Sequence, residues 1–183
     1  MVRKKIKDKD LLWLLDEIID SAEGIPIGNY LSQFFANLYL TYFMHFINEE
    51  LKLDATEYAD DICFFSSSKE NLIKSTTKIE EYLKTLKLKI KHNYQIFPIA
   101  KNKYDKYGRG LDYVGYVFYK NQKALRKSIK YNFCNKVKKI NKKELPPKEY
   151  KQIICPWLGW AKHSKSKHLL KTIIKDNYYE SIL

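Results

Sequence analysis

The stretch "TEYADDICFFSSS", residues 56–68, sets two adjacent carboxylates between an aromatic residue and an apolar run. Asp60 and Asp61 follow Tyr58 and precede the apolar residues 62–65. A polar pair between two short apolar runs predicts a β-hairpin that carries the aspartates at its tip. Carboxylate oxygens in that position suit a hard cation such as Mg²⁺. The same residue type also occurs in ordinary turns, where it accepts hydrogen bonds from backbone N–H groups.

Hydrophobic periodicity on both sides of this hairpin predicts an α+β fold, an antiparallel sheet with helices on one face. A Gly/Pro-rich loop at residues 24–28 separates the first two helices, and Ser67 with Glu70 forms a capping box before the third. The loop 100–110, "AKNKYDKYGRG", is polar and basic. We expect helices over residues 10–20, 30–50, 69–86, 126–142, 147–155 and 165–176, and further strands over 87–91, 94–99 and 111–119.

The charge of the chain is distributed unevenly along its length. The 183 residues carry a net charge of +13, and 45% of them are apolar, which is enough for a globular core. Residues 1–120 hold 18 Lys/Arg and 17 Asp/Glu, whereas residues 121–183 hold 16 Lys/Arg and 4 Asp/Glu, a net charge of +12. A nearly neutral body with a strongly basic C-terminal third favours a polyanion partner, with nucleic acid first. A lysine-rich solvated surface explains the same charge equally well.

Neither a membrane protein nor a secreted protein is expected from this sequence. Charged or polar residues interrupt every apolar stretch before it reaches the length of a membrane span. The residues "MVRKKIKDKD" do not lead into the apolar segment of a secretory signal. The three cysteines, Cys63, Cys134 and Cys155, are widely spaced without a CxxC motif, so we expect reduced thiols in a cytoplasmic protein.

Three motifs follow one another along the chain: "GIPIGNYLSQFFANLYL" at residues 24–40, "YADD" at 58–61 and "LDYVGYVF" at 111–118. Their order and spacing resemble those of reverse transcriptases, whose YxDD box stands between a Gly-x-Pro-x-Gly motif and a hairpin that grips the primer terminus. The tail "WLGWAKHSKSKHLLK", residues 157–171, is similar to the C-terminal segment of bacterial reverse transcriptases of the group II intron and diversity-generating retroelement kind. The resemblance covers nearly the whole chain.

The resemblance implies DNA synthesis directed by an RNA template, from a DNA primer, with Mg²⁺ as the metal and Mn²⁺ as its substitute. Asp60 and Asp61 would be the catalytic and metal-binding pair. The nucleotide and template would contact Tyr58, Ser32, Gln33, Gly24 and Gly28, and the primer grip would include Tyr113, Gly115 and Tyr116. By the same resemblance, residues 1–120 would form partial fingers and palm, and residues 121–183 a basic, thumb-like helical segment.

The third metal-binding carboxylate of the family is missing from the expected place. In the family it lies in an Asp-x-x-x-[FY] strand well upstream of the Gly-Pro-Gly motif. Here Asp16, Glu17 and Asp20 precede that motif on an expected helix. We therefore expect the C-terminal portion of a reverse transcriptase, inactive when isolated. The alternatives left open are a truncated or interrupted gene product, one half of a split enzyme whose first half is a second chain, and a reading frame cut at its start.

The family's candidate proton donor, the lysine of a later Lys-Thr pair, also has no counterpart. Asn93 or Tyr94 stands at that place, so we assign no general acid, although three basic residues lie nearby: Lys89, Lys91 and His92.

Other functions remain open from the sequence. A nucleic-acid-binding module without catalysis, or a relic of a retroelement, would use the basic C-terminal third. Aromatic residues available there for base stacking are Tyr119, Tyr131, Trp157 and Trp160. An unrelated α+β domain with a chance YADD would need three ordered coincidences.

Overall fold

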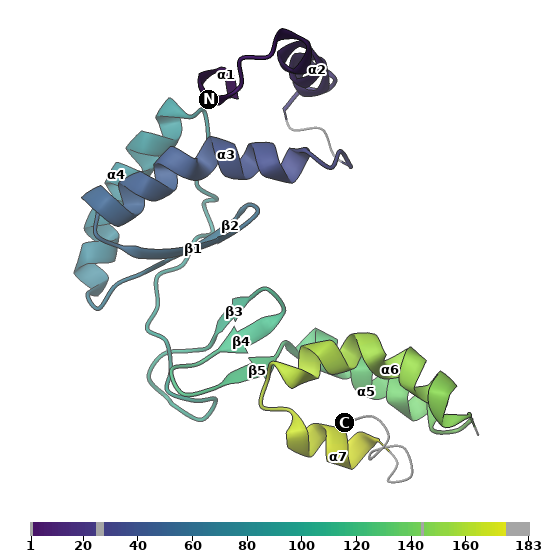
Figure 1. Ribbon diagram of the computed structural model, residues 1–183. Coiled ribbons are helices and arrows are strands. Elements are labelled where there is room, and N and C mark those ends of the chain that lie inside the picture. Colours follow the sequence, from purple (N-terminus) through teal and green to yellow (C-terminus); the bar gives the residue numbers. More distant parts are fainter. Residues whose placement is uncertain (1, 25–27, 144, 175–183) are drawn as a thin grey trace. The chain divides into compact units, whose positions relative to one another are not determined.

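A computed structural model describes residues 2–24, 28–143 and 145–174 of the chain. The chain divides into two compact units, Met1–Ile96 and Phe97–Leu183, which are described separately below. Both units combine helices with a small antiparallel sheet, two strands in the first and three in the second, so the predicted α+β class is confirmed (Figure 1).

The first unit follows the helix and hairpin pattern predicted for it. Asp8 caps the helix that begins at Lys9, because its carboxylate accepts a hydrogen bond from the backbone N–H of Leu11 at 2.8 Å. The helix expected over residues 30–50 is confirmed in extent, although its last turn is a π-helix. The elements are α1 Val2–Lys5, α2 Lys9–Asp20, α3 Ser32–His45, η1 Phe46–Glu50, β1 Asp54–Tyr58, β2 Asp61–Phe65 and α4 Lys69–Thr85.

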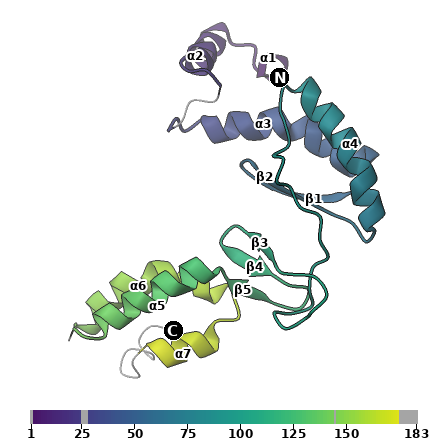
Figure 2. The same ribbon diagram turned by 180° about the vertical axis from the view of Figure 1, so that it is seen from behind.

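The core of the first unit lies between its hairpin and its two long helices. Side chains of both strands, including Ala55, Ile62 and Phe64, pack against this core. Helices α3 and α4 therefore cover one face of the β1–β2 hairpin, as two opposite views show (Figures 1 and 2). The buried cluster consists of Phe43, Ile47, Leu53, Ile79 and Leu83.

Two local predictions for the first unit are wrong. The cap of α4 is Ser68 rather than Ser67: its backbone is extended, and its hydroxyl accepts from the N–H of Asn71 at 3.3 Å. The helix begins at Lys69, one residue later than a cap at Ser67 requires. Glu70 is therefore the second helical residue, and the capping box needs its Glu at the third. Residues 87–91 form no strand. Ile90 is half-buried against the core, but within the described residues no neighbouring strand offers the backbone hydrogen bonds that a strand needs.

The second unit begins with short strands and ends with three helices. Its elements are β3 Leu111–Tyr113, β4 Tyr116–Phe118, β5 Lys123–Leu125, α5 Lys127–Ile140, α6 Pro147–Lys162 and α7 Lys167–Ile173. The predicted strand over 111–119 is a hairpin, in agreement with the motif resemblance, and β5 was not predicted. The strand expected over 94–99 is absent, apart from an isolated bridge between Ile99 and Arg109.

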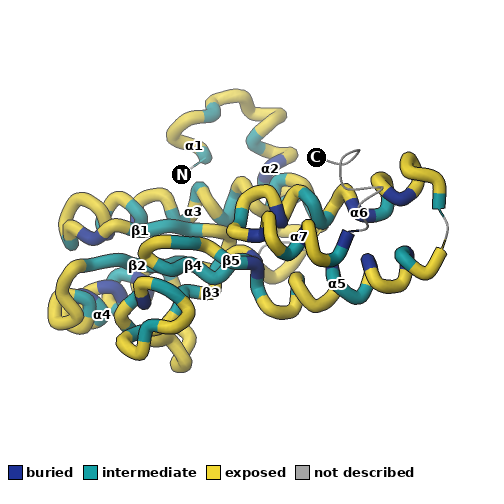
Figure 3. Tube along the Cα trace, turned by 90° about the horizontal axis from the view of Figure 1, so that it is seen from below, coloured by how far each residue is buried: buried dark blue, intermediate teal, exposed yellow. Residues whose placement is uncertain are grey.

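Helix α6 is longer than expected, since it continues through Pro156 to Lys162 instead of ending at residue 155. A proline inside a helix removes one backbone hydrogen bond. Buried Ile154 and Ala161 lie on either side of it, so side-chain packing holds the helix together across the break. Along such helices the buried positions recur on one side while the rest stays exposed (Figure 3).

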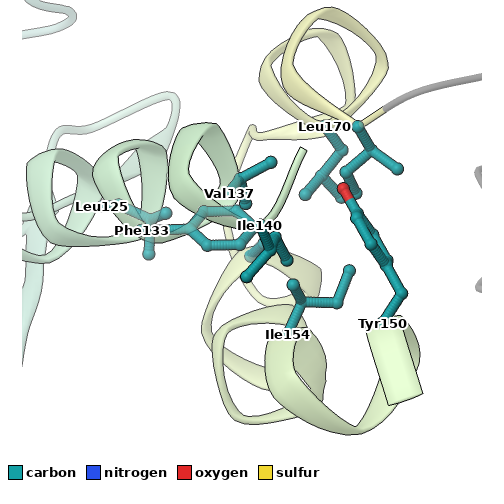
Figure 4. Packing of buried hydrophobic residues seen from close by; sticks show 9 residues of the cluster. Leu125, Phe133, Val137, Ile140, Tyr150, Ile154 and Leu170 are labelled. Atoms are coloured by element: carbon teal, nitrogen blue, oxygen red, sulfur yellow. The ribbon is translucent and has the colours of Figure 1, made fainter. Parts of the chain in front are cut away.

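Helices α5, α6 and α7 enclose the core of the second unit (Figure 4). Phe133, Val137, Tyr150 and Ile154 are all fully buried there, at 0% exposure. The hydroxyl of Tyr150 donates to the side-chain oxygen of Asn141 at 2.7 Å, and the Asn141 amide donates to a carbonyl near the end of α7 at 2.9 Å. This relay ties the three helices together by hydrogen bonds as well as by packing.

Within the described ranges, no helix combines the length and the apolar character that crossing a bilayer requires.

We expect Tyr150→Phe to lower the free energy of unfolding by about 1 kcal/mol, the usual net contribution of one hydrogen bond. Chemical denaturation followed by circular dichroism would measure it. Tyr131→Phe is the matched control: that ring is 66% exposed, so the change should stay below about 0.5 kcal/mol. Equal stability of the parent and Tyr150→Phe would contradict the linking role of the relay.

Candidate functional site

The turn between β1 and β2 consists of Ala59 and Asp60, and Asp61 is already paired with Tyr58 as the first residue of β2. The hairpin prediction is therefore confirmed, with Asp60 at the tip and Asp61 beside it. Ala59 has a positive φ of 53°, a left-handed conformation that costs a residue with a Cβ atom about 1–2 kcal/mol. Backbone strain of this kind gathers at functional sites.

The register of the two strands separates their side chains into two faces. Ala55 and Glu57 stand opposite Phe64 and Ile62, on the face that packs against the core. Since side chains alternate along a strand, Asp61 points to the other face, which α3 and α4 do not cover. Tyr58 is 56% exposed. The predicted site residues Tyr58, Asp60 and Asp61 thus stand together on the hairpin.

Glu57 is a further carboxylate near the end of this hairpin, but its side chain lies on the opposite face from Asp61. Its Oε1 atom is buried and has no hydrogen-bond partner among the residues described. Burial raises the pKa of this carboxyl. Alternation places Glu57 opposite Ile62, away from the face of Asp61, so it does not supply the third carboxylate.

Asp60 is paired with a lysine that the sequence did not assign. The ammonium of Lys91 lies 3.4 Å from Asp60 Oδ2, and the two side chains are 70% and 83% exposed. Such exposed pairs contribute only about 0–1 kcal/mol, so Lys91 can be displaced by a stronger cation. The sequence pointed to Lys91 only as one of three basic residues near a missing proton donor.

Cys63 lies on the same face of β2 as Asp61, the face away from α3 and α4, two positions along the strand, and it is half-buried there. Burial raises the pKa of its thiol, and the nearby negative charge of Asp61 raises it further. The thiol therefore stays protonated at neutral pH and is a poor nucleophile. The pKa of the Cys63 thiol therefore reports whether the Asp61 carboxylate lies close to it.

The remaining residues predicted for nucleotide and template binding lie before and at the start of α3. Ser32 and Gln33 form its first turn, where the N–H of Ser32 donates to the Asn29 carbonyl at 3.1 Å. Gly24 and Gly28 both have a φ of +85°, and apart from the adjoining backbone no atom of the described residues lies within 4 Å of where a Cβ would stand. The proline of the same motif, Pro26, lies outside the described residues.

In the second unit, Tyr113 and Tyr116 pair across the β3–β4 hairpin, and Gly115 lies in the turn between them. The three residues predicted for the primer grip are therefore neighbours. The turn residues Val114 and Gly115 have φ values of 45° and 78°, as in tight hairpin turns of the primed types. The valine is unusual in this conformation, because a β-branched side chain disfavours positive φ.

The second hairpin is held against α6 by Trp160. The hydroxyl of Tyr116 donates to the Trp160 carbonyl at 3.1 Å, and the two rings lie 5.3 Å apart. A Cβ at Gly115 would come within 2.3 Å of the Trp160 ring, so this position has no room for a side chain. Arg126 binds the same hairpin through two hydrogen bonds. Its guanidinium donates to the Asp112 carboxylate at 2.6 Å, and its backbone N–H donates to the Gly115 carbonyl at 3.0 Å.

Both tryptophans of α6 make packing contacts, and their availability for stacking on bases stays a prediction. Trp157 stacks on Phe133 with ring centroids 5.8 Å apart, and Trp160 covers the turn of the hairpin. Tyr119 is half-buried, and Tyr131, at 66% exposure, is more exposed than Trp160, at 36%.

The donor set on the first hairpin fits a hard divalent cation only in part. Asp60 and Asp61 offer carboxylate oxygens, the ligands that Mg²⁺ prefers, and this ion commonly binds through one or two carboxylates together with waters and substrate phosphates. Among the residues that the structure describes, no group of three or more His, Cys, Asp or Glu side chains gathers to hold a metal. Asp60 and Asp61 thus supply two carboxylate ligands of a metal site, and other groups have to supply the rest.

Comparison with protein families connects this geometry to a known class. The family model described as "Reverse transcriptase (RNA-dependent DNA polymerase)" matches residues 12–117. That range contains the whole Asp60–Asp61 hairpin and the β3–β4 hairpin up to Val117. A search of curated proteins gives no significant match.

If Asp61 lies beside Cys63, Asp61→Asn should lower the pKa of the thiol and speed its alkylation at neutral pH. The burial contribution remains, so the thiol should still react more slowly than an exposed one. The measurement is the pH dependence of the reaction with a thiol reagent, in a protein whose Cys134 and Cys155 are replaced by Ser. Glu81→Gln, an exposed change on α4, is the control and should have no effect. An unchanged pH profile in Asp61→Asn would rule out the shared face.

Gly115→Ala should destabilise the protein by at least about 2 kcal/mol, because it adds left-handed strain and a clash with Trp160. Gly159→Ala, in the same helix as Trp160 with open space around it, should instead stabilise by about 0.5–1 kcal/mol. Thermal unfolding would measure both. In the double variant Gly115→Ala/Trp160→Leu the clash is gone, so the loss in unfolding free energy should be smaller than the sum of the two single losses. A loss equal to that sum would refute the contact.

Proposed function

Because the chain belongs to the reverse transcriptase (RNA-dependent DNA polymerase) family, we propose that its YADD hairpin is the catalytic hairpin of a template-directed DNA polymerase. The observation that carries this proposal is the placement of Asp60 and Asp61 at the end of a hairpin within the matched residues. We place the chain nearest to the bacterial group II intron and diversity-generating retroelement reverse transcriptases, on the motifs quoted above.

In this proposal Asp60 and Asp61 hold Mg²⁺, or Mn²⁺ in its place. When bound, the metal supplies positive charge that stabilises the attacking and leaving oxygens of nucleotidyl transfer. The two aspartates contribute the anionic oxygens, and the rigid packing of the hairpin on α3 and α4 keeps them in place. Lys91 neutralises Asp60 in the absence of the metal.

The other predicted residues receive positioning roles around an RNA template and a DNA primer. Tyr58, next to the aspartates, would contact the primer end or the incoming nucleotide. The same partners would meet the start of α3 and the turn of the second hairpin. The residues proposed there are Ser32, Gln33, Gly24 and Gly28, and then Tyr113, Gly115 and Tyr116. Residues 1–120 would act as partial fingers and palm, and residues 121–183 as a basic, thumb-like helical segment.

We also propose that the isolated chain has no polymerase activity and that a second chain supplies the missing carboxylate. Three observations support this. No third ligand joins Asp60 and Asp61 within the described residues. The β1–β2 sheet has two strands there, so the outer edge of each is available for pairing. Helix α2 exposes apolar side chains, with Trp13 at 63% and Leu14 at 48% exposure, which a partner can cover.

A second candidate function is nucleic-acid binding without catalysis. The net charge of +12 on residues 121–183 favours it, since lysines that neutralise phosphates release counterions. Exposed Tyr131 on α5 adds a ring that can stack on a base. This function needs neither aspartate.

Primer extension on an RNA template, with Mg²⁺ and separately with Mn²⁺, tests the proposal. The isolated chain should give no extension, and addition of a polypeptide carrying the family's upstream Asp-containing strand should restore it. Asp60→Ala should then reduce the restored rate at least about 100-fold, because the metal contributes several kcal/mol of charge stabilisation. Asp54→Ala, an exposed carboxylate at the far end of β1, is the matched control and should leave the rate unchanged.

Two outcomes would contradict parts of the proposal. Extension by the isolated chain that disappears in Asp60→Ala would show a complete metal site and overturn the need for a partner. Failure of the added half to restore extension or to tighten Mn²⁺ binding would overturn the catalytic assignment and leave nucleic-acid binding alone.

A further inference from the structure

The base of the basic loop 100–110 is fixed to its own unit by backbone hydrogen bonds. The N–H of Ala100 donates to the Arg109 carbonyl, and the N–H of Arg109 donates to the Pro98 carbonyl, each at 3.0 Å. On the other side, the N–H of Lys120 donates to the Ala100 carbonyl at 3.0 Å. Gly108 closes the loop with a φ of +93°, and a Cβ there would lie 2.4 Å from the Pro98 oxygen.

The interior of the loop is organised by two polar side chains. Asp105 accepts hydrogen bonds from the backbone N–H groups of Lys101 and Tyr107, both at 2.9 Å, and these bonds lower the pKa of its carboxyl. Asn102 accepts from the N–H of Tyr104 at 2.9 Å. The loop is therefore folded before any partner arrives, and binding to it costs little ordering entropy.

The side chains that this loop exposes to solvent are aromatic and basic. Tyr104 and Tyr107 are 80% and 77% exposed, although neither ring is needed for the hydrogen bonds that fold the loop. Both line one open hollow of about 430 Å³, within the size range of ligand sites. The ammonium of Lys103 lies 4.6 Å from the centre of the Tyr104 ring. Lys101 also lines the hollow, and Lys120 lies near enough to Asp105 to help lower the pKa of that carboxyl. Lys106 is a further exposed cation of the same loop.

We propose that the loop formed by residues 101–107 binds single-stranded nucleic acid, with bases stacked on Tyr104 and Tyr107 and phosphates held by the surrounding lysines. Rings beside cations match the alternation of base and phosphate along a strand. A duplex does not offer the same contact, because its base faces are already stacked on one another. This proposal rests on the proposed function in one respect, the choice of nucleic acid as the partner. It does not require the chain to be catalytically active.

Fluorescence anisotropy of the full chain with labelled oligo(rU) and oligo(dT) tests this inference. Tyr104→Ala and Tyr107→Ala should each weaken binding at least about fivefold, the effect expected for one stacked base. The salt dependence of binding should stay the same, because tyrosine releases no counterion. Lys103→Ala should instead reduce the slope of log K against log salt by about 0.7. Tyr104→Phe and Tyr107→Phe should bind as the parent does.

Controls separate stacking from charge and from loss of fold. Tyr42→Ala removes an exposed ring from α3 and should leave binding unchanged. Heparin, a polyanion without bases, should bind the tyrosine variants and the parent equally. Both tyrosine variants should unfold at the parent's temperature, since the rings are exposed. A loss confined to oligo(rU) would assign the loop to RNA, and a loss confined to oligo(dT) would assign it to DNA.

Parental oligonucleotide affinity in the double variant Tyr104→Ala/Tyr107→Ala, or an equal loss toward heparin, would overturn the inference. Oligonucleotide binding is measured on the full chain alone, without divalent metal, nucleotides or the added upstream polypeptide. Failure of primer extension and failure of this site are therefore separate results.

Discussion

The antiparallel register of β1 and β2 decides the direction of every side chain at the candidate catalytic hairpin. Ala55 pairs with Phe64 and Glu57 with Ile62, and this face is buried against the first core. A shift of one residue would send Ile62 and Phe64 into solvent and turn Asp61 toward the core. Burial of the apolar face therefore fixes Asp61 on the face away from the core, so the hydrophobic effect sets the direction of this carboxylate.

The two hairpins are stabilised in different ways. The first depends on apolar packing behind it, and its tip, with Asp60, stands in solvent. The second is supported at its turn by Trp160 and by both the backbone and the side chain of Arg126. A nucleic-acid strand that contacts the second hairpin would thus meet a surface that the C-terminal helices already hold in place. The basic C-terminal third of the chain therefore supports the β3–β4 motif that precedes it in sequence.

Sequence patterns predicted most of the helices and the first hairpin well, because apolar periodicity and turn residues are local properties, whereas the second hairpin was expected only from the motif resemblance. They failed where the outcome depends on a partner distant in sequence. Residues 87–91 alternate like a strand, yet no neighbouring strand accepts their hydrogen bonds within the described unit. The pairing of Lys91 with Asp60 and the packing of Trp160 on Gly115 likewise arise only when the chain folds back on itself. Motif resemblance, rather than periodicity, identified the aspartates.

The three tryptophans occupy three different environments, and this has a spectroscopic consequence. Trp13 is mostly in water, at 63% exposure, whereas Trp157 lies against Phe133 and Trp160 against Tyr116. Indole emission shifts to the red in water, so each tryptophan has its own emission range. With Trp13 and Trp157 replaced by phenylalanine, the remaining indole becomes an intrinsic optical probe of the β3–β4 turn, and events at that turn can be followed without attaching a label.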